Sequence, residues 1–152
     1  MKNWLWWGLA ALLLFGGGVA VYTMTRGLRN NNPGNLRKSN DAWQGLSPTQ
    51  TDDDFFQFVN PTWGIRALGK VLQTYMTRYG LHTVASIVTR WAPPNENDTL
   101  AYIDSVASLM GVDANQSLSD EDLPALTKAI IKHENGINPY SDAVIDGGLA
   151  LV

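Results

Sequence analysis

The sequence predicts one mainly α-helical domain with a small β-region, preceded by a single N-terminal transmembrane helix. Three observations lead to this prediction. The chain has 152 residues, 45% of them hydrophobic, which is enough for one domain with a core but not for two. Residues 4–22 carry no charge. After residue 60, apolar residues recur at helical spacing between capping and stop signals.

The transmembrane helix is expected at residues 4–22, WLWWGLAALLLFGGGVAVY. About 19 apolar residues that rise ~1.5 Å each nearly match the ~30 Å hydrocarbon core of a bilayer. Tryptophans at one end and Tyr22 at the other suit the headgroup level. A cleaved signal peptide is the alternative, but the length and the tryptophans fit it poorly. We therefore assign residues 1–25 to a membrane anchor and residues 26–152 to the folded domain.

Basic residues flank the predicted span unevenly. Lys2 alone precedes it, whereas four basic residues follow it closely: Arg26, Arg29, Arg37 and Lys38. Because basic flanks tend to stay in the cytoplasm, the domain is expected on the cytoplasmic face of the membrane.

The segment from Gly27 to Phe58 is rich in Asn, Gly, Pro and Asp and contains short apolar pieces. This composition is typical of turns and of two or three short strands, so the small β-region is placed here. The three adjacent acids at 52–54 lack the spaced pattern of a calcium loop, and they are expected to form a solvated turn.

Four helices are predicted after this segment. They begin at capping residues or proline, and most of them end at a glycine. The last one opens with a capping-box pair, Ser119 and Asp122. The predicted helices cover, in order, residues 60–80, 83–91, 97–111 and 119–136.

Glu134 falls on the apolar face of the last predicted helix. At about 100° per residue, Leu126, Ile130 and Ile131 define that face, and Glu134 follows Ile130 by one turn. We therefore expect Glu134 to point inward. A carboxyl group removed from water keeps its proton more readily and can act as an acid. The alternative is that the helix frays at Lys132 and that Glu134 is solvated.

Four segments of the chain resemble parts of one enzyme family. ENGINPYS, from Glu134 to Ser141, resembles the Glu-Ser-x-Phe-Asn-Pro-x-Ala/Ser signature of soluble lytic transglycosylases and goose-type lysozymes. GLRNNNP resembles their Gly-Leu-Met-Gln-Leu-Met-Pro segment. GIRALGKVLQTYMTRYG and IVTRWAPPNENDTLAYIDSV look like their long helix and the following Tyr-Asn-Ala-Gly region. The glutamate helix comes first in that family and last here, so the resemblance implies a circularly permuted order. Asn135 replaces the usual serine.

The combination RNNNPGNLR, RWAPPNENDT and HENG more closely resembles lysozyme-like virion proteins of bacteriophages and prophages, over residues 26–146. This resemblance implies a lysozyme-like, helix-dominated α+β domain that cleaves peptidoglycan between N-acetylmuramic acid and N-acetylglucosamine. It implies that Glu134 is the catalytic acid and that Asn30 contacts substrate. Trp91 and Tyr102 match the two aromatic residues that line the cleft in the family.

The other amides and tryptophans of the chain are expected to have structural roles. Asn31, Asn32 and Asn35 stand next to Pro and Gly, which is ordinary turn chemistry. Trp43 and Trp63 are assigned to the core.

No second acid has a convincing motif position, and Asp98 and Asp142 are the nearest guesses. A single glutamate fits a lytic transglycosylase, in which the substrate's own 6-hydroxyl closes an anhydro ring; hydrolysis by a muramidase stays open. No metal or organic cofactor is expected, because the chain has no cysteine and because His82 and His133 lack the spacing of a zinc site.

The expected partners are the glycan strands of peptidoglycan and the lipid bilayer, with capsid or other virion membrane proteins as further candidates. A net charge of −3 argues against nucleic acid. The expected location is the internal membrane of a virion or the host inner membrane, with a single span. The alternative function is that of a catalytically silent structural protein of a virion membrane, which binds peptidoglycan or the capsid.

Overall fold

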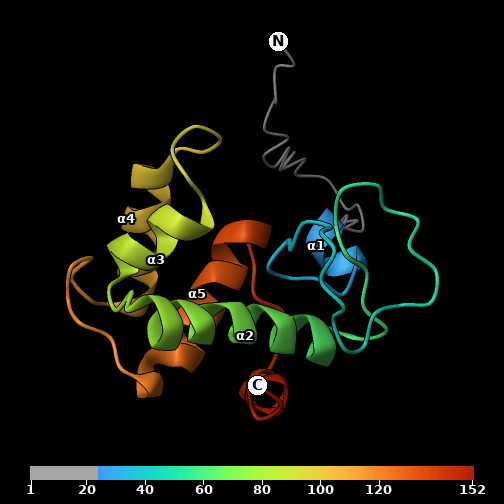
Figure 1. Cartoon of the computed structure of the whole chain (residues 1–152). Helices are drawn as coiled ribbons and strands as arrows, with labels where there is room; N and C mark the ends of the chain where they lie inside the picture. The colour runs from blue at the N-terminus through green and yellow to red at the C-terminus, as the bar shows by residue number, and fades with distance from the viewer. Residues whose placement is uncertain (1–23) are drawn as a thin grey trace, which may run out of the picture.

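The computed structural model describes residues 24–152, which form six α-helices and one short 3-10 helix (Figure 1). This part of the chain contains no named β-strand, so the mainly α class is confirmed. The elements are α1 (Arg26–Arg29), α2 (Pro61–Tyr79), α3 (Val84–Trp91), α4 (Thr99–Met110), η1 (Asp120–Asp122), α5 (Leu123–Asn135) and α6 (Asp142–Leu149).

The predicted membrane span at residues 4–22 lies outside the described residues, as does almost all of the predicted anchor at 1–25. No helix within residues 24–152 is both long enough and apolar enough to cross a bilayer.

The prediction of short strands between α1 and α2 is wrong. This segment forms two isolated antiparallel bridges, Arg37 with Phe55 and Leu46 with Phe58. A side-chain amide makes hydrogen bonds that paired strands would otherwise make between their main chains. Buried Asn32 donates to the main-chain oxygens of Leu36 and Phe56 and accepts from the Leu36 N–H. Because Asn32 satisfies these main-chain groups, the segment stays ordered without extended strands.

The predicted helices begin and end where their capping residues lie. The side chain of Asn60 accepts from the Trp63 N–H at the start of α2, and Thr83 forms a capping box with Ser86 at the start of α3. Glycines in the left-handed conformation end α2, α4 and α5, with φ of 64° at Gly80, 69° at Gly111 and 72° at Gly136. Helices α1 and α6 were not expected from the sequence.

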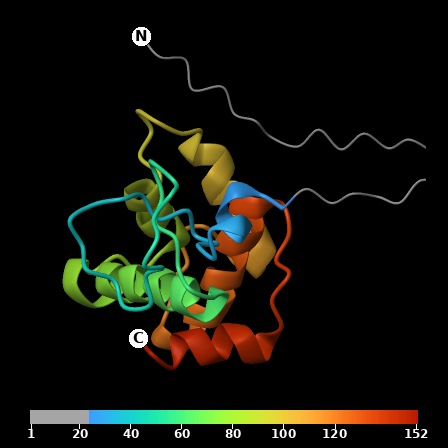
Figure 2. The same ribbon diagram turned by 90° about the vertical axis from the view of Figure 1, so that its right-hand side faces the viewer.

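Helix α2 forms the base of the domain, and α5 packs against it, as well as against α4, α6 and α1. Residues 30–60, between α1 and α2, are called the irregular segment below. Figure 1 shows α3 and α4 over one end of α2. Helix α1 and the irregular segment lie over the other end, and α5 lies between the two groups. Figure 2 shows α6 below the domain, beside α2. Fully buried side chains fill the centre, among them Ile65, Leu68, Leu72, Ile87, Val106, Leu126, Ile130 and Ile145.

One apolar residue of α4, Leu100, is 75% exposed although it precedes Ile103 by three residues. The buried face of this helix is formed by Tyr102, Ile103 and Val106. Because Tyr102 belongs to this face, the face is directed toward α5. Leu100, in the first turn of the helix, lies beyond the edge of the buried face. The helix therefore presents a tyrosine hydroxyl to the end of α5.

Candidate active site

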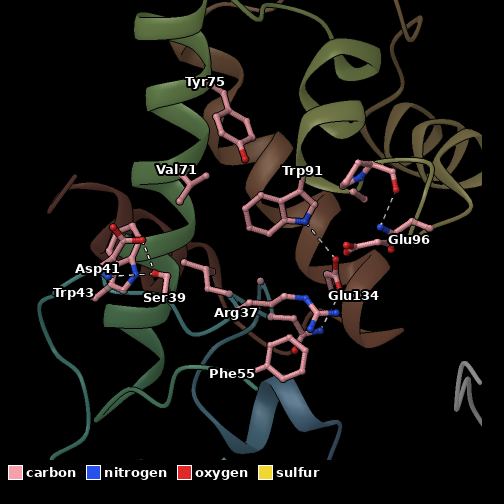
Figure 3. Close-up of a pocket in the computed structure, with 16 residues that line it drawn as sticks. Arg37, Ser39, Asp41, Trp43, Phe55, Val71, Tyr75, Trp91, Glu96 and Glu134 are labelled. Atoms are coloured by element: carbon pink, nitrogen blue, oxygen red, sulfur yellow. Dashed lines mark hydrogen bonds between the residues drawn. The ribbon is translucent and has the colours of Figure 1, made fainter. Parts of the chain in front are cut away.

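An open pocket of about 400 Å³ lies between the irregular segment and the end of α3. The segment contributes residues that include Asn35, Arg37 and Trp43, and α2 contributes Val71 and Tyr75. Trp91 and the loop that follows it form the opposite wall. Glu134, near the end of α5, reaches the same pocket (Figure 3).

Glu134 is half-buried, and its carboxyl group accepts three hydrogen bonds. The Tyr102 hydroxyl donates to Oε1 at 2.7 Å, and the Trp91 Nε1–H donates to the same atom at 3.4 Å. The Asn35 Nδ2–H donates to Oε2 at 2.9 Å. Helix α5 continues through Asn135, so the alternative of a frayed end with a solvated glutamate is wrong. The donors fix the carboxyl group at the pocket wall.

Tyr102 supports Glu134 from inside the protein. It is 2% exposed, and its ring stacks on His133 with 3.7 Å between ring centroids. Burial raises the pKa of Tyr102 well above its usual value, and the neighbouring Glu134 charge acts in the same direction. Tyr102 therefore keeps its proton and remains a donor. Burial also lowers the pKa of His133, so this ring is neutral near pH 7.

Asn35 has a left-handed backbone conformation, with φ of 51°. This conformation is uncommon outside glycine, although asparagine tolerates it better than most residues. The Asn35 side chain lies close to Gly27 of α1. A Cβ atom added to Gly27 would lie only 2.6 Å from Asn35 Oδ1. Gly27 therefore leaves space for the amide whose nitrogen donates to Glu134.

Asn135 anchors the end of α5 beside the site. It is 4% exposed, and its Nδ2 donates to the main-chain oxygens of Pro33 and Ile131. Its Oδ1 accepts from the Thr25 hydroxyl at 2.6 Å. The residue that stands in place of the serine of the resembled signature thus joins α5 to α1 and to the irregular segment.

Asn30 lies elsewhere. It is 6% exposed and does not line the pocket. Its Nδ2 donates to Asp52 Oδ2 at 2.8 Å, and its Oδ1 accepts from Gln57. The structure brings Glu134, Trp91 and Tyr102 together but not Asn30, and Asn35 is the amide that reaches the glutamate.

The turn expected at 52–54 is solvated only in part: Asp53 is exposed and the Asp54 side chain is 42% exposed, but the Asp52 side chain is 9% exposed and pairs with Arg26 at 2.6 Å. The hydrogen bond from Arg26 lowers the pKa of Asp52 well below its usual range. Arg26 also pairs with Asp54 and lies over the Phe55 ring. This cluster ties α1 to the irregular segment.

Neither of the two acids guessed from the sequence as a second carboxylate lines the pocket. Asp98 caps α4, and Asp142 is 81% exposed and pairs with Lys128. Two acids that the sequence analysis did not single out, Asp41 and Glu96, do line it. Figure 3 shows both among the pocket residues, with Glu96 on the same side as Glu134.

The aromatic residues of the pocket include one that the sequence assigned to the core. Trp43 lines the pocket together with Phe55, Tyr75 and Trp91. Trp63 packs instead against Gly45, whose φ of 75° and missing side chain make room for the indole. The pocket therefore combines flat apolar rings, amides and one carboxyl group held by three donors.

No protein-family model matches the chain. Over 132 residues it is 46% identical to Protein P5 of Pseudoalteromonas phage PM2, and the match covers 82% of this chain and 82% of the phage protein. The chain belongs to the family of this Protein P5. The predicted relationship to bacteriophage proteins is thereby confirmed, because this P5-family chain is a homologue of a bacteriophage protein.

In this member of the P5 family, a side chain that can give and take a proton stands at the wall of a pocket with apolar faces and hydrogen-bonding groups. Such a pocket can hold a flat polar ligand and protonate one of its oxygens. Among residues 24–152, no three His, Asp or Glu side chains gather as a metal site would require.

Proposed function

We propose that this P5-family protein is a peptidoglycan-cleaving enzyme of the lytic transglycosylase type, with Glu134 as its catalytic acid. The observation that carries the proposal is the triple hydrogen bonding of Glu134 at the wall of an aromatic-lined pocket. A general acid must be held within hydrogen-bond reach of the group that it protonates. Tyr102, Trp91 and Asn35 supply that constraint from three different elements of the fold.

The hydrogen-bond pattern favours one oxygen of Glu134 as the proton donor in the proposed reaction. A carboxyl group offers about four lone-pair positions, two on each oxygen. Oε1 accepts from both Tyr102 and Trp91, whereas Oε2 accepts from Asn35 alone. The position that stays open is therefore on Oε2, and this atom is the proposed proton donor.

The proposed reaction needs no water and no second carboxylate. Glu134 gives its proton to the glycosidic oxygen, and the bond from that oxygen to C1 of N-acetylmuramic acid breaks. The 6-hydroxyl of the same sugar then attacks C1 and loses its proton to the Glu134 carboxylate. An anhydro ring and a free N-acetylglucosamine hydroxyl result, and Glu134 returns to its starting protonation state.

The pocket supplies groups suited to a glycan strand. The rings of Trp91, Tyr75 and Trp43 offer apolar faces on which sugar rings can pack, and the neighbouring polar groups can bond hydroxyl and acetamido groups. No metal or organic cofactor takes part in the proposed reaction.

Hydrolysis is the second candidate chemistry, and a specific observation favours it. Asp41 and Glu96 line the same pocket as Glu134, and glycosidases that add water use a second carboxylate as base or nucleophile. In that case water takes the place of the 6-hydroxyl, and the product has a reducing end.

The silent structural alternative explains the site less well. Asn35 holds a left-handed backbone and Tyr102 is buried, yet both direct a donor at one carboxyl group beside a pocket. A protein that only binds peptidoglycan or the capsid has no need for a carboxyl group held in this way.

The proposed location is the internal membrane of the virion. The basic residues after the span favour a cytoplasmic domain, where peptidoglycan is absent. A phage that takes its membrane from the host would carry this face outward beneath its capsid, and the enzyme would meet the cell wall at the next infection. Protease treatment of right-side-out and inside-out host vesicles tests this: cleavage of the domain from the periplasmic side alone would contradict the storage role.

The activity is tested by digesting purified peptidoglycan with the full-length chain in detergent micelles and weighing the products by mass spectrometry. Anhydro ends are the predicted result. Reducing ends would establish the hydrolytic chemistry instead, and no soluble product at all would refute the enzyme proposal.

A further inference from the structure

A second feature of the surface lies next to the pocket, at the end of α3. Arg90 precedes the pocket residue Trp91, and its guanidinium lies 4.0 Å from the ring centroid of Tyr79 and 5.2 Å from that of Tyr75. Tyr79 is 47% exposed. The two rings of α2 thus hold the positive charge of Arg90 in a defined place at the surface.

Arg90 has no carboxylate partner within residues 24–152, whose ion pairs join Arg26 to Asp52 and Asp54, and Lys128 to Asp142. Stacking on aromatic rings uses the flat face of a guanidinium. Arg90 also hydrogen-bonds the Tyr75 hydroxyl, and the remaining N–H groups of its edge are left for other partners. That edge matches the two oxygens of a carboxylate. Arg90 is therefore prepared for an acidic ligand that the domain itself does not supply.

A shallow hollow of about 610 Å³ surrounds this charge. None of the residues that line it is acidic: Leu81, Thr83, Ala85, Ser86, Thr89, Arg90 and Asn115. It is open to solvent, which suits an extended chain better than an enclosed small molecule. The lining offers hydroxyl and amide groups around one cation.

The hollow and the Glu134 pocket share no lining residue, but residues in contact with each other connect them. Tyr75 lines the pocket on one side and carries Arg90 on the other. Arg90 and Trp91 are consecutive on α3, so they point about 100° apart, one toward each hollow. A substituent attached to a sugar that is bound beside Trp91 can therefore pass the end of α3 and reach Arg90.

We propose that this hollow binds the acidic stem peptide carried by N-acetylmuramic acid, with Arg90 bonding one of its free carboxylates. The inference rests on the proposed function, because it takes the glycan strand to lie in the Glu134 pocket. The site makes the protein prefer peptide-substituted strands over bare ones.

The test is binding of the full-length chain, in detergent micelles, to peptidoglycan immobilised on a solid support. The Glu134→Gln background keeps the sacculi intact during the measurement. Two substrates are compared: intact sacculi, and glycan strands stripped of peptides by an amidase, which retain the lactyl carboxylate on the sugar. Arg90→Gln is compared with Arg90→Lys and with Lys132→Gln, which removes an exposed positive charge on α5 outside both hollows.

Arg90→Gln should weaken binding to intact sacculi roughly three- to tenfold and leave binding to stripped strands unchanged. Arg90→Lys should recover part of the loss, since it keeps the charge without the planar fork. Lys132→Gln should change neither. Equal losses on both substrates, or no loss on either, would overturn the peptide site.

Cleavage by the unmodified Glu134 enzyme is measured in parallel, so that the two proposals fail separately. An Arg90-dependent preference without any cleavage would refute the proposed activity and retain the peptide site. Cleavage without an Arg90-dependent preference would support the proposed activity and refute the peptide site.

Discussion

Replacing Tyr102 by phenylalanine removes a single oxygen from the support of Glu134. The ring and its stacking on His133 stay, so the change isolates the hydrogen bond of 2.7 Å to Glu134 Oε1. A hydrogen bond contributes about 0.5–1.5 kcal/mol between neutral groups and about 1.5–3 kcal/mol to a charged group, and water can partly replace this one because Glu134 is half-buried. We therefore expect a loss of about 1–2 kcal/mol in unfolding free energy, or roughly 4–10 °C in Tm.

The effect on activity should exceed the effect on folding. Without the Tyr102 hydroxyl, Oε1 keeps only the longer bond of 3.4 Å from Trp91, and the carboxyl group can rotate. Poor alignment of a catalytic group costs roughly 10–100-fold in rate, so kcat should fall by that factor with KM nearly unchanged.

The assay is the release of soluble fragments from sacculi, with thermal unfolding measured on the same preparations. Tyr140→Phe is the matched control, because Tyr140 is half-buried and does not line the Glu134 pocket. A Tyr102→Phe enzyme with unchanged kcat would refute the view that the hydroxyl positions the acid.

Three further predictions concern the irregular segment. Asn35→Gly keeps the left-handed backbone at φ of 51° but removes the amide, so activity should fall with little change in Tm; Asn35→Ala should lose the same activity and about 1 kcal/mol of stability as well. Arg26 holds the pKa of Asp52 in the folded protein below its ordinary value of 3.8, so the pair stabilises the fold above about pH 4 and this contribution is lost as the pH falls. In Asp52→Asn, Tm should therefore depend less on pH below about pH 4. Asn30→Ala should lower Tm at constant specific activity, whereas a sugar contact predicts lost activity at constant Tm.

The helices that carry strong local signals could be predicted from the sequence. Helix α2 begins at the Asn60 cap and ends at Gly80, as expected from residues that act within one turn. Helix α6 was missed because Gly147 and Gly148 weaken its local signal. The reason for Gly148 is tertiary: a Cβ there would lie 2.6 Å from Ile65 of α2.

The site was predictable where one helix face decides it. Periodicity put Glu134 on the apolar face but left a frayed, solvated end open. The motif match favoured the inward orientation and assigned Trp91 and Tyr102 to the same cleft. The sequence could not tell which asparagine reaches the glutamate, because the answer depends on the path of a loop whose contact with Glu134 spans 99 residues. The burial of Asp52 depends in the same way on its pairing with Arg26 from α1.

The measurement that tests the central claim most directly is the activity of Glu134→Gln on purified peptidoglycan, in the full-length chain. Glutamine keeps the shape of the side chain and can still accept from Tyr102 and Trp91, but it has no proton to give. The account predicts a folded protein with wild-type-like Tm and with activity reduced roughly 10²–10⁴-fold. A folded Glu134→Gln protein that releases fragments at the wild-type rate would contradict it.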